Sequence, residues 1–189
     1  MADQSDESRG GPIILIDNNL IQSFLSKEIG PQLEPILKEV VDIKAELAVS
    51  DIILYEALKA IVFDEKKWKP VADFIDNTLA RYEVNRDVLI NAAKVHELYG
   101  GNENTRNHRQ GISTEDIIIA TTSMMLGAYI MTSDCNDFPR PFFTEVNKQI
   151  VFYKQGVRTK HIVIYLLQPD MEVIEHGLNH LVKVKTPTK

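Results

Sequence analysis

Four acidic residues stand where a carboxylate is costly to bury without a partner. Asp17 ends the apolar run "IILI" and Asp134 follows the run "YIMTS". Glu56 lies within "DIILYEALKAI", and Asp116 leads directly into three isoleucines in "STEDIIIATT". A buried acid needs a compensating charge, and the chain offers no matching set of basic residues in apolar contexts. The pattern predicts a hard divalent cation, Mg²⁺ or Mn²⁺, because these ions take oxygen ligands.

Each acid also has an ordinary structural interpretation, which the sequence leaves open. Asp116 stands three residues after Ser113, the spacing of a capping box. That role is compatible with metal binding, since the helix dipole favours a carboxylate at this end. Glu56 precedes Lys59 at the i+3 spacing of a surface ion pair. The acids that could instead form Asx-turns are Asp17, Asp134 and Asp137.

Hydrophobic periodicity predicts the elements that position these acids. Short apolar runs predict strands over 12–16, 46–50 and 128–131, as in a buried parallel sheet. Helical spacing predicts helices over 18–27, 32–47, 51–63, 68–100 and 113–126. After Pro139, alternation of apolar and polar residues predicts a hairpin around Gln155–Gly156. Over 170–189 we expect one helical turn followed by a basic tail.

The order of these elements predicts an α/β fold: a three-layer α/β/α sandwich with a mainly parallel sheet and a C-terminal β-hairpin. At 189 residues the chain fits one domain. We expect a flexible leader over 1–11, a core over 12–138, and a C-terminal extension over 139–189 packed on the same domain. In open parallel sheets, ligands bind beyond the carboxyl ends of the strands, where Asp17 and Asp134 are expected.

Composition and charge indicate which partners, cross-links and cellular location to expect. The net charge of -6 argues against a surface coated in basic residues for nucleic acid. From residue 140 onward, however, 8 Lys and Arg face 4 Asp and Glu, a balance of +4, which leaves -10 for the preceding part. The single cysteine excludes an internal disulfide framework. "MADQSDESRGG" has no apolar signal region and no apolar run would span a bilayer, so a cytoplasmic protein without a membrane partner is expected.

Three segments of the sequence resemble the PIN-domain family, the metal-dependent ribonuclease fold common in VapC-type toxins. They are "IILIDNNLIQSFL", "AVSDIILYEAL" and "STEDIIIATTSMMLGAYIMTSDCNDF". The resemblance covers about two thirds of the chain, from residue 12 to residue 138. It implies a parallel, flavodoxin-like sheet with acids at one edge. The chain departs from the family pattern in carrying Asn18 and Asn19 after its first acid, and in its long C-terminal extension.

The resemblance also implies roles for individual residues. The catalytic acids would be Asp17, Glu56, Asp116 and Asp134. Mg²⁺ or Mn²⁺ would be held by Asp17, Asp116 and Asp134. Auxiliary roles would fall to Asp137 as a further carboxylate, Thr132 as a hydroxyl near the metal or the phosphate, and Ser50 as a polar support or helix cap. Apart from the resemblance, the loop and the C-terminal part carry basic residues that could contact RNA phosphates or be solvated surface charges: Arg106, Arg109, Lys154, Arg158 and Lys160.

The function expected from these residues is a metal-dependent endoribonuclease acting on RNA phosphodiester bonds, as the toxin of a type II toxin–antitoxin pair. An antitoxin protein would then be a partner, and the family often forms homodimers. Two alternatives remain open in the sequence: an RNA-processing nuclease outside any toxin–antitoxin pair, and a PIN-like binding or assembly module without catalysis. A phosphatase or DNA nuclease would use the same acids, which do not encode the sugar.

Overall fold

A six-stranded sheet forms the middle of the molecule, in the order β3-β2-β1-β4-β6-β5. The structure is a computed structural model that describes residues 10–102, 105 and 111–185. The predicted leader over 1–11 therefore lies almost entirely outside the described residues. Four strands are parallel: β1 (Ile13–Ile16), β2 (Glu46–Ser50), β3 (Ala80–Tyr82) and β4 (Tyr129–Thr132). The other two, β5 (Phe143–Gln155) and β6 (Arg158–Pro169), are antiparallel.

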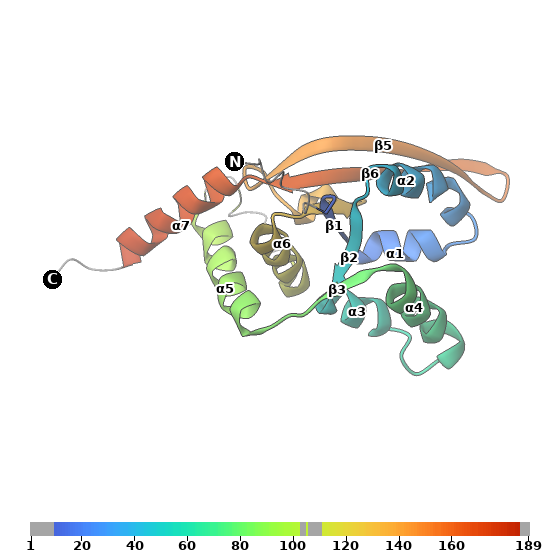
Figure 1. Cartoon of the computed structure of the whole chain (residues 1–189), viewed down its shortest axis with the longest axis horizontal. Coiled ribbons are helices and arrows are strands. Elements are labelled where there is room, and N and C mark those ends of the chain that lie inside the picture. The colour runs from blue at the N-terminus through green and yellow to red at the C-terminus, as the bar shows by residue number, and fades with distance from the viewer. Residues whose placement is uncertain (1–9, 103–104, 106–110, 186–189) are drawn as a thin grey trace, which may run out of the picture.

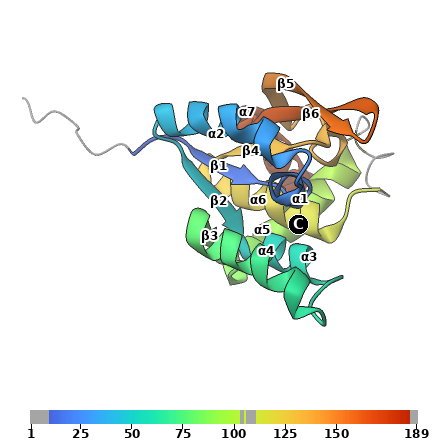
Figure 2. The same ribbon diagram turned by 90° about the vertical axis from the view of Figure 1, so that its right-hand side faces the viewer.

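Helices cover both faces of this sheet, which confirms the predicted α/β sandwich. They are α1 (Asn18–Leu25), α2 (Gly30–Asp42), α3 (Asp51–Leu58), α4 (Glu65–Thr78), α5 (Arg86–Gly101), α6 (Thr114–Leu126) and α7 (Met171–Lys185). Figures 1 and 2 show α2 on one side of the parallel strands and α5 and α6 on the other. α3 contacts both α1 and α6, and so links a helix that follows β1 to the helix that precedes β4.

The predicted parallel strands are confirmed, and one further strand was missed. The strands predicted over 46–50, 12–16 and 128–131 lie side by side in that order, as a flavodoxin-like sheet begins. β3 extends the sheet beyond β2. It lies in a segment that helical spacing assigned to one long helix over 68–100, and that prediction was wrong. A strand of three residues is too short to show an alternating pattern.

The break in the predicted long helix has a local cause. α4 ends at Thr78, and α5 begins after Asn85, whose side-chain oxygen accepts hydrogen bonds from the backbone N–H groups of Asp87 and Val88, both at 3.0 Å. This is a helix N-cap. The residues between them, "LARYEVN", are left to pair with β2 and to lead into α5.

The predicted C-terminal hairpin is confirmed, and the predicted ending of the chain was wrong. β5 and β6 pair along their length around Gly156, whose φ of +61° suits glycine. The next segment forms α7, not a single turn. Asp170 begins α7 by accepting a hydrogen bond from the Val173 N–H at 3.1 Å. Gly177 lets α7 approach α5, since a Cβ there would lie 2.5 Å from Leu98 Cδ1.

α6 matches its prediction at both ends. Ser113 and Asp116 form the expected capping box at its start, and Gly127 ends it in the left-handed conformation. The helix is buried along most of its length and packs against β1, β4 and β6. Its N-terminus is thereby placed beside the carboxyl ends of β1 and β4. Among the described helices, none is both long enough and apolar enough to cross a membrane.

Candidate active site at the carboxyl ends of β1 and β4

Asp17 is the buried centre of a hydrogen-bond network at the end of β1. Its side chain accepts hydrogen bonds from the Asn18 N–H at 2.7 Å, Asn19 Nδ2 at 2.6 Å and Thr132 Oγ1 at 2.8 Å. Its own N–H donates to the Met131 carbonyl at 3.0 Å, which ties β1 to β4. Asp17 is only 4% exposed. Its carboxylate is therefore held in one orientation by α1 and β4 together.

Thr132 and Asn19 support Asp17 with all of their hydrogen-bonding groups. The Thr132 hydroxyl donates to Asp17 and accepts from the Asp134 N–H and from Asn19 Nδ2, at 3.0 and 3.1 Å. The side-chain oxygen of Asn19, Oδ1, accepts from the Ser133 N–H at 3.0 Å. In the structure Thr132 is thus a positioning residue for Asp17. The role of Asn19 was missed from the sequence, where it was noted only as a turn former and as a departure from the family pattern.

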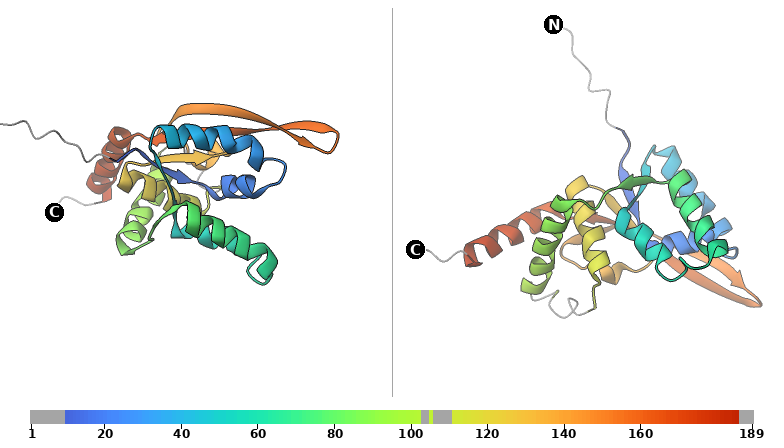
Figure 3. Two further views of the ribbon diagram at one scale, coloured as in Figure 1. Left: turned by 45° about the vertical axis from the view of Figure 1, so that its right-hand side comes forward. Right: turned by 90° about the horizontal axis from the view of Figure 1, so that it is seen from below.

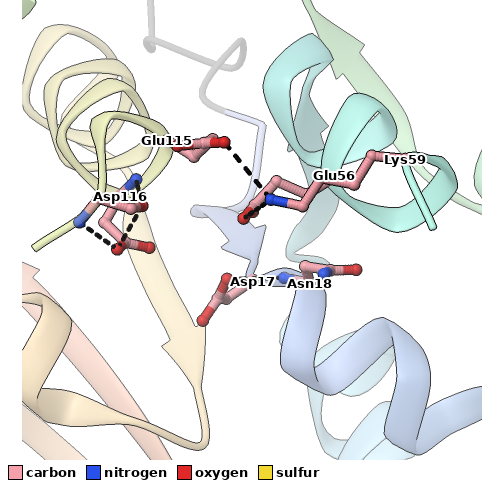
Figure 4. Close-up of polar contacts among 7 residues, drawn as sticks. Asp17, Asn18, Glu56, Lys59, Glu115 and Asp116 are labelled. Atoms are coloured by element: carbon pink, nitrogen blue, oxygen red, sulfur yellow. Dashed lines mark hydrogen bonds and ion pairs between the residues drawn. The ribbon is translucent and has the colours of Figure 1, made fainter.

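Glu56 reaches the same region from α3 and is linked to α6 through a lysine. Lys59 Nζ lies 3.7 Å from Glu56 Oε1 and 3.4 Å from Glu115 Oε1. The ion pair expected at i+3 is therefore present, and it includes an acid of α6 that sequence reasoning did not single out. Figure 4 shows the carboxyl groups of Glu56, Asp17 and Asp116 facing one space between α3, α1 and α6.

Asp116 performs the helix-capping role that the sequence left open. Asp116 Oδ2 accepts from the Ser113 N–H at 3.0 Å and from Ser113 Oγ at 2.6 Å, and the Asp116 N–H donates to Ser113 Oγ at 3.0 Å. Among the described residues, Asp116 Oδ1 has no such donor. The capping box consequently fixes the carboxyl group while leaving one oxygen turned toward the acidic space.

The acidic loop after β4 places two more carboxylates, and the auxiliary one is the more enclosed. Asp134 is exposed and begins a 3₁₀ turn, η1 (Cys135–Asp137), by accepting from the N–H and the side-chain amide of Asn136 at 3.0 and 2.9 Å. The Asx-turn interpretation of Asp134 is therefore confirmed. Asp137 is half-buried and makes no hydrogen bond or ion pair within the described part of the chain.

Three of these acids hold their protons more tightly than usual. Burial raises the pKa of Glu56 to about 7, and the nearby carboxylates of Asp116 and Asp17 add to the rise. Burial likewise raises the pKa of Asp137 to about 7, and four charges add to it: Asp116, Asp134, Asp17 and Glu56. Burial also raises the pKa of Asp17, although the hydrogen bonds it accepts act in the opposite direction. The five predicted acids therefore form one electrostatic unit.

The geometry of this unit is looser than a formed metal centre. Within residues 10–102, 105 and 111–185, no three Asp, Glu, His or Cys side chains lie close enough together to hold a metal ion. Each of three acids accepts hydrogen bonds from neutral groups of the protein: Asp17 from Asn19 and Thr132, Asp116 from Ser113, and Asp134 from Asn136. The donor set nevertheless fits a hard divalent cation, since all the groups are carboxylates. A cation would offset the negative charges that, together with burial, raise the pKa values of Asp17, Glu56 and Asp137.

Two buried hydroxyl groups lack a hydrogen-bond partner among the described residues: Ser50 Oγ and Tyr99 Oη. Ser50 occupies the N-cap position of α3 as expected, but its side chain makes no capping bond. Tyr99 belongs to α5 and was not identified from the sequence. Burial raises the pKa of Tyr99, and Asp116 adds to that rise, which places this hydroxyl near the acidic space.

Some of the predicted basic residues lie within the described part of the chain and others do not. Arg106 and Arg109 lie outside the described residues. The cations of the C-terminal part, Lys154, Arg158 and Lys160, are exposed on the β5–β6 hairpin.

Comparison with known proteins supports the fold. No family model and no curated protein matches the sequence. Among solved structures, a chain of the VapBC2 complex from Rickettsia felis, bound to a DNA fragment from the promoter, is similar with a TM-score of 0.51 and 19% sequence identity. The match covers 67% of this chain and 90% of that chain. At this level of identity, the likeness establishes the shared fold, in agreement with the α/β architecture predicted from the sequence.

Proposed function

We propose that the protein is a metal-dependent endoribonuclease that hydrolyses RNA phosphodiester bonds. The observation that carries this proposal is a group of carboxylates from four separate segments, in which burial and the neighbouring negative charges raise the pKa values of Asp17, Glu56 and Asp137. Burying several like charges is unfavourable for folding. A fold that maintains such a group is well explained by a site that binds a cation and a phosphate.

The residues of the site would divide this chemistry between them. Asp17, Asp116 and Asp134 are the proposed ligands of Mg²⁺ or Mn²⁺, which activates a water molecule and offsets the charge of the phosphate. Glu56 has a pKa of about 7, which suits a group that accepts a proton near neutral pH. Asp137 is equally placed to take a proton or to bind a second cation. Thr132 and Asn19 keep the Asp17 carboxylate in position.

The cellular role is a separate part of the proposal. Because the VapBC2 structure shares the fold, we propose that this chain is the toxin of a toxin–antitoxin pair and binds an antitoxin. A protein that copurifies in a defined ratio and inhibits cleavage would support that role. An RNA-processing nuclease would instead cleave without such an inhibitor.

Cleavage of a structured RNA by the purified full-length chain tests the enzymatic proposal. We expect cleavage with Mn²⁺ or Mg²⁺, none in EDTA, and a loss of at least about 100-fold in Asp17→Asn and in Asp116→Asn. Glu175→Gln, an exposed acid on α7, is the matched control and should cleave normally. Activity that survives both site variants would show that a contaminant is responsible. Equal activity on DNA or on a phosphate monoester would overturn the ribonuclease assignment.

Metal binding has its own readout that does not depend on activity. Mn²⁺ should raise the Tm of the wild-type protein, because a ligand that binds only the folded state stabilises it. The increase should be smaller in Asp17→Asn and unchanged in Glu175→Gln. A module that binds RNA without catalysis would show RNA binding with neither cleavage nor a specific increase in Tm.

A further inference from the structure

The β5–β6 hairpin extends past the edge of the sheet that carries the acidic site. Thr132, the last residue of β4, pairs with Tyr165 of β6. Because the two strands are antiparallel, the residues of β6 before Tyr165 continue beyond the carboxyl end of β4. They pair there only with β5. Figure 1 and the right panel of Figure 3 show the hairpin reaching beyond the parallel strands.

The two faces of this hairpin differ. On one face, Gln149 Nε2 donates to Glu39 Oε2 of α2 at 3.0 Å, so α2 lies against that face near Gln149. The cross-strand register places alternate residues on the opposite face. There Lys148 Nζ lies 5.1 Å from the centre of the Tyr165 ring, and the rings of Phe152 and His161 lie 6.0 Å apart. We call this second face, built on the pairs 148/165, 150/163, 152/161 and 154/159, the outer face.

The outer face combines exposed aromatic and apolar side chains with positive charge. Phe152 is 63% exposed and Ile150 is 54% exposed. Two cations, Lys148 and Lys154, lie on this face, and Arg158 and Lys160 pair with Gln155 and Tyr153 on the opposite face. The two strands carry the single acid Glu145, in a chain whose net charge is -6. An exposed row of aromatic rings between lysines is the arrangement that binds single-stranded nucleic acid, through base stacking and phosphate contacts.

The outer face is continuous with the acidic site. Thr132, which bonds to Asp17, is the cross-strand neighbour of Tyr165, so the two side chains lie on the same face of the sheet. A hollow of about 380 Å³ lies between the acidic loop and the base of the hairpin, and its lining includes Asn136, Arg140 and Glu145. From residue 148 to residue 154 the outer face then spans roughly 20 Å, which accommodates several nucleotides.

We propose that the outer face of the hairpin binds single-stranded RNA and leads it to the acidic site. This inference rests on the proposed function and names its substrate class as an unpaired RNA segment. Bases would stack on Phe152, His161 and Tyr165, and phosphates would contact Lys148 and Lys154. A protein partner or a second copy would also cover exposed apolar side chains. The local excess of cations beside a site for phosphodiesters favours RNA.

Binding of a labelled RNA in EDTA tests this inference without requiring cleavage. Fluorescence anisotropy with a fluorescein-labelled U₁₂ RNA, and with a 12-base-pair RNA duplex, should show preference for the single strand. Phe152→Ala should raise the Kd for U₁₂ by about tenfold. Lys148→Gln with Lys154→Gln should reduce the slope of log K against log salt by about 1.4, the value for two lost phosphate contacts on a single strand.

Matched controls lie on other exposed surfaces. Phe63, in the connection between α3 and α4, is fully exposed at 102%, and Lys38 and Lys94 are exposed on α2 and α5. Phe63→Ala and the pair Lys38→Gln with Lys94→Gln should bind U₁₂ like the wild type. Wild-type binding by the hairpin variants, no binding by the wild-type protein, or equal losses in the controls would overturn the inference.

The outcomes separate this inference from the proposed function. Hairpin-dependent binding without cleavage in Mn²⁺ would support the RNA track and refute the enzyme. Metal-dependent cleavage with unaltered RNA binding by the hairpin variants would support the enzyme and refute the role of the outer face. A change in molar mass by light scattering in Phe152→Ala, with unchanged anisotropy, would identify the outer face as a protein interface and overturn the RNA track.

Discussion

At the scale of single residues, the carboxylates of the site differ in the hydrogen bonds that hold them and in how far burial and neighbouring charges raise their pKa values. Asp17 and Asp116 are fixed by hydrogen bonds from Thr132 and Ser113. Glu56 and Asp137 have weaker local support and carry the pKa values near 7. The carboxylates fixed by several hydrogen bonds suit cation binding, whereas Glu56 and Asp137, whose pKa values lie near 7, suit proton transfer. Asp137 thereby becomes a stronger candidate than its auxiliary place in the sequence motif implied.

The raised pKa values predict how stability depends on pH. An acid with a higher pKa in the folded state favours folding when protonated, so this stabilisation is complete below about pH 4 and is lost as pH rises through about 7. In EDTA at pH 8, Glu56→Gln and Asp137→Asn should each increase the free energy of unfolding by roughly 1–3 kcal/mol. The gain should disappear by pH 4.

Urea denaturation at pH 4, 6 and 8 measures this effect. Asp73→Asn, an exposed acid on α4, provides the control for loss of a charge and should follow the wild type at every pH. Site variants that are no more stable than the wild type at pH 8 would contradict the electrostatic account.

At the scale of elements, α6 connects stability to the site. Its N-terminal capping box holds Asp116, and its buried length packs against three strands. The pairing of Lys59 with Glu115 and Glu56 joins α6 to α3. Two of the candidate acids thus lie at helix N-termini, Asp17 as the N-cap of α1 and Asp116 in the capping box of α6, whereas Glu56 lies within α3.

Ser113→Ala should lower the stability of the protein and should also loosen the position of the Asp116 carboxylate. The loss of an N-cap costs about 0.5–2 kcal/mol in the free energy of unfolding, and Asp116 loses the hydroxyl that bonds to its carboxylate at 2.6 Å. We expect lower stability in urea denaturation and slower metal-dependent RNA cleavage. Ser113→Thr retains a hydroxyl and should stay close to the wild type in both measurements. Reduced stability with normal cleavage would separate the cap from the function of Asp116.

At the scale of the whole molecule, the acidic residues of the site and the cations of the hairpin lie in different parts of the fold. The acidic site lies where β1, β4, α3 and α6 meet, and the cations follow in the C-terminal hairpin. The base of β6 completes the sheet next to β4, whereas its outer part pairs only with β5. The hairpin therefore has a structural half and a half that is available for binding.

Shortening the hairpin tests this division. Val151 pairs with Ile162, so replacing residues 152–161 with Asn-Gly would close the strands through a two-residue turn. We expect a cooperative thermal transition with a Tm within a few degrees of the wild type, since the removed residues are exposed or border solvent. U₁₂ binding should fall at least as far as in Phe152→Ala. Loss of cooperative unfolding would show that the outer half supports the core.

The sequence by itself determined the features that depend on local order along the chain. Apolar runs specify the strands β1, β2 and β4, and the spacing of Ser113, Asp116 and Gly127 specifies the ends of α6. Because parallel strands place their carboxyl ends at one edge, the acids at positions 17 and 134 could be assigned to a common region from the sequence.

Only the tertiary structure decided which groups interact within that region. The contacts of Asn19 with Thr132 and of Lys59 with Glu115 join segments far apart in the chain, and no local pattern encodes them. The same holds for β3, which is specified by pairing with β2, and for α7, which is specified by packing against Leu98. The pKa of Asp137 follows from burial and from charges on other elements, and such long-range electrostatics exists only once the chain has folded.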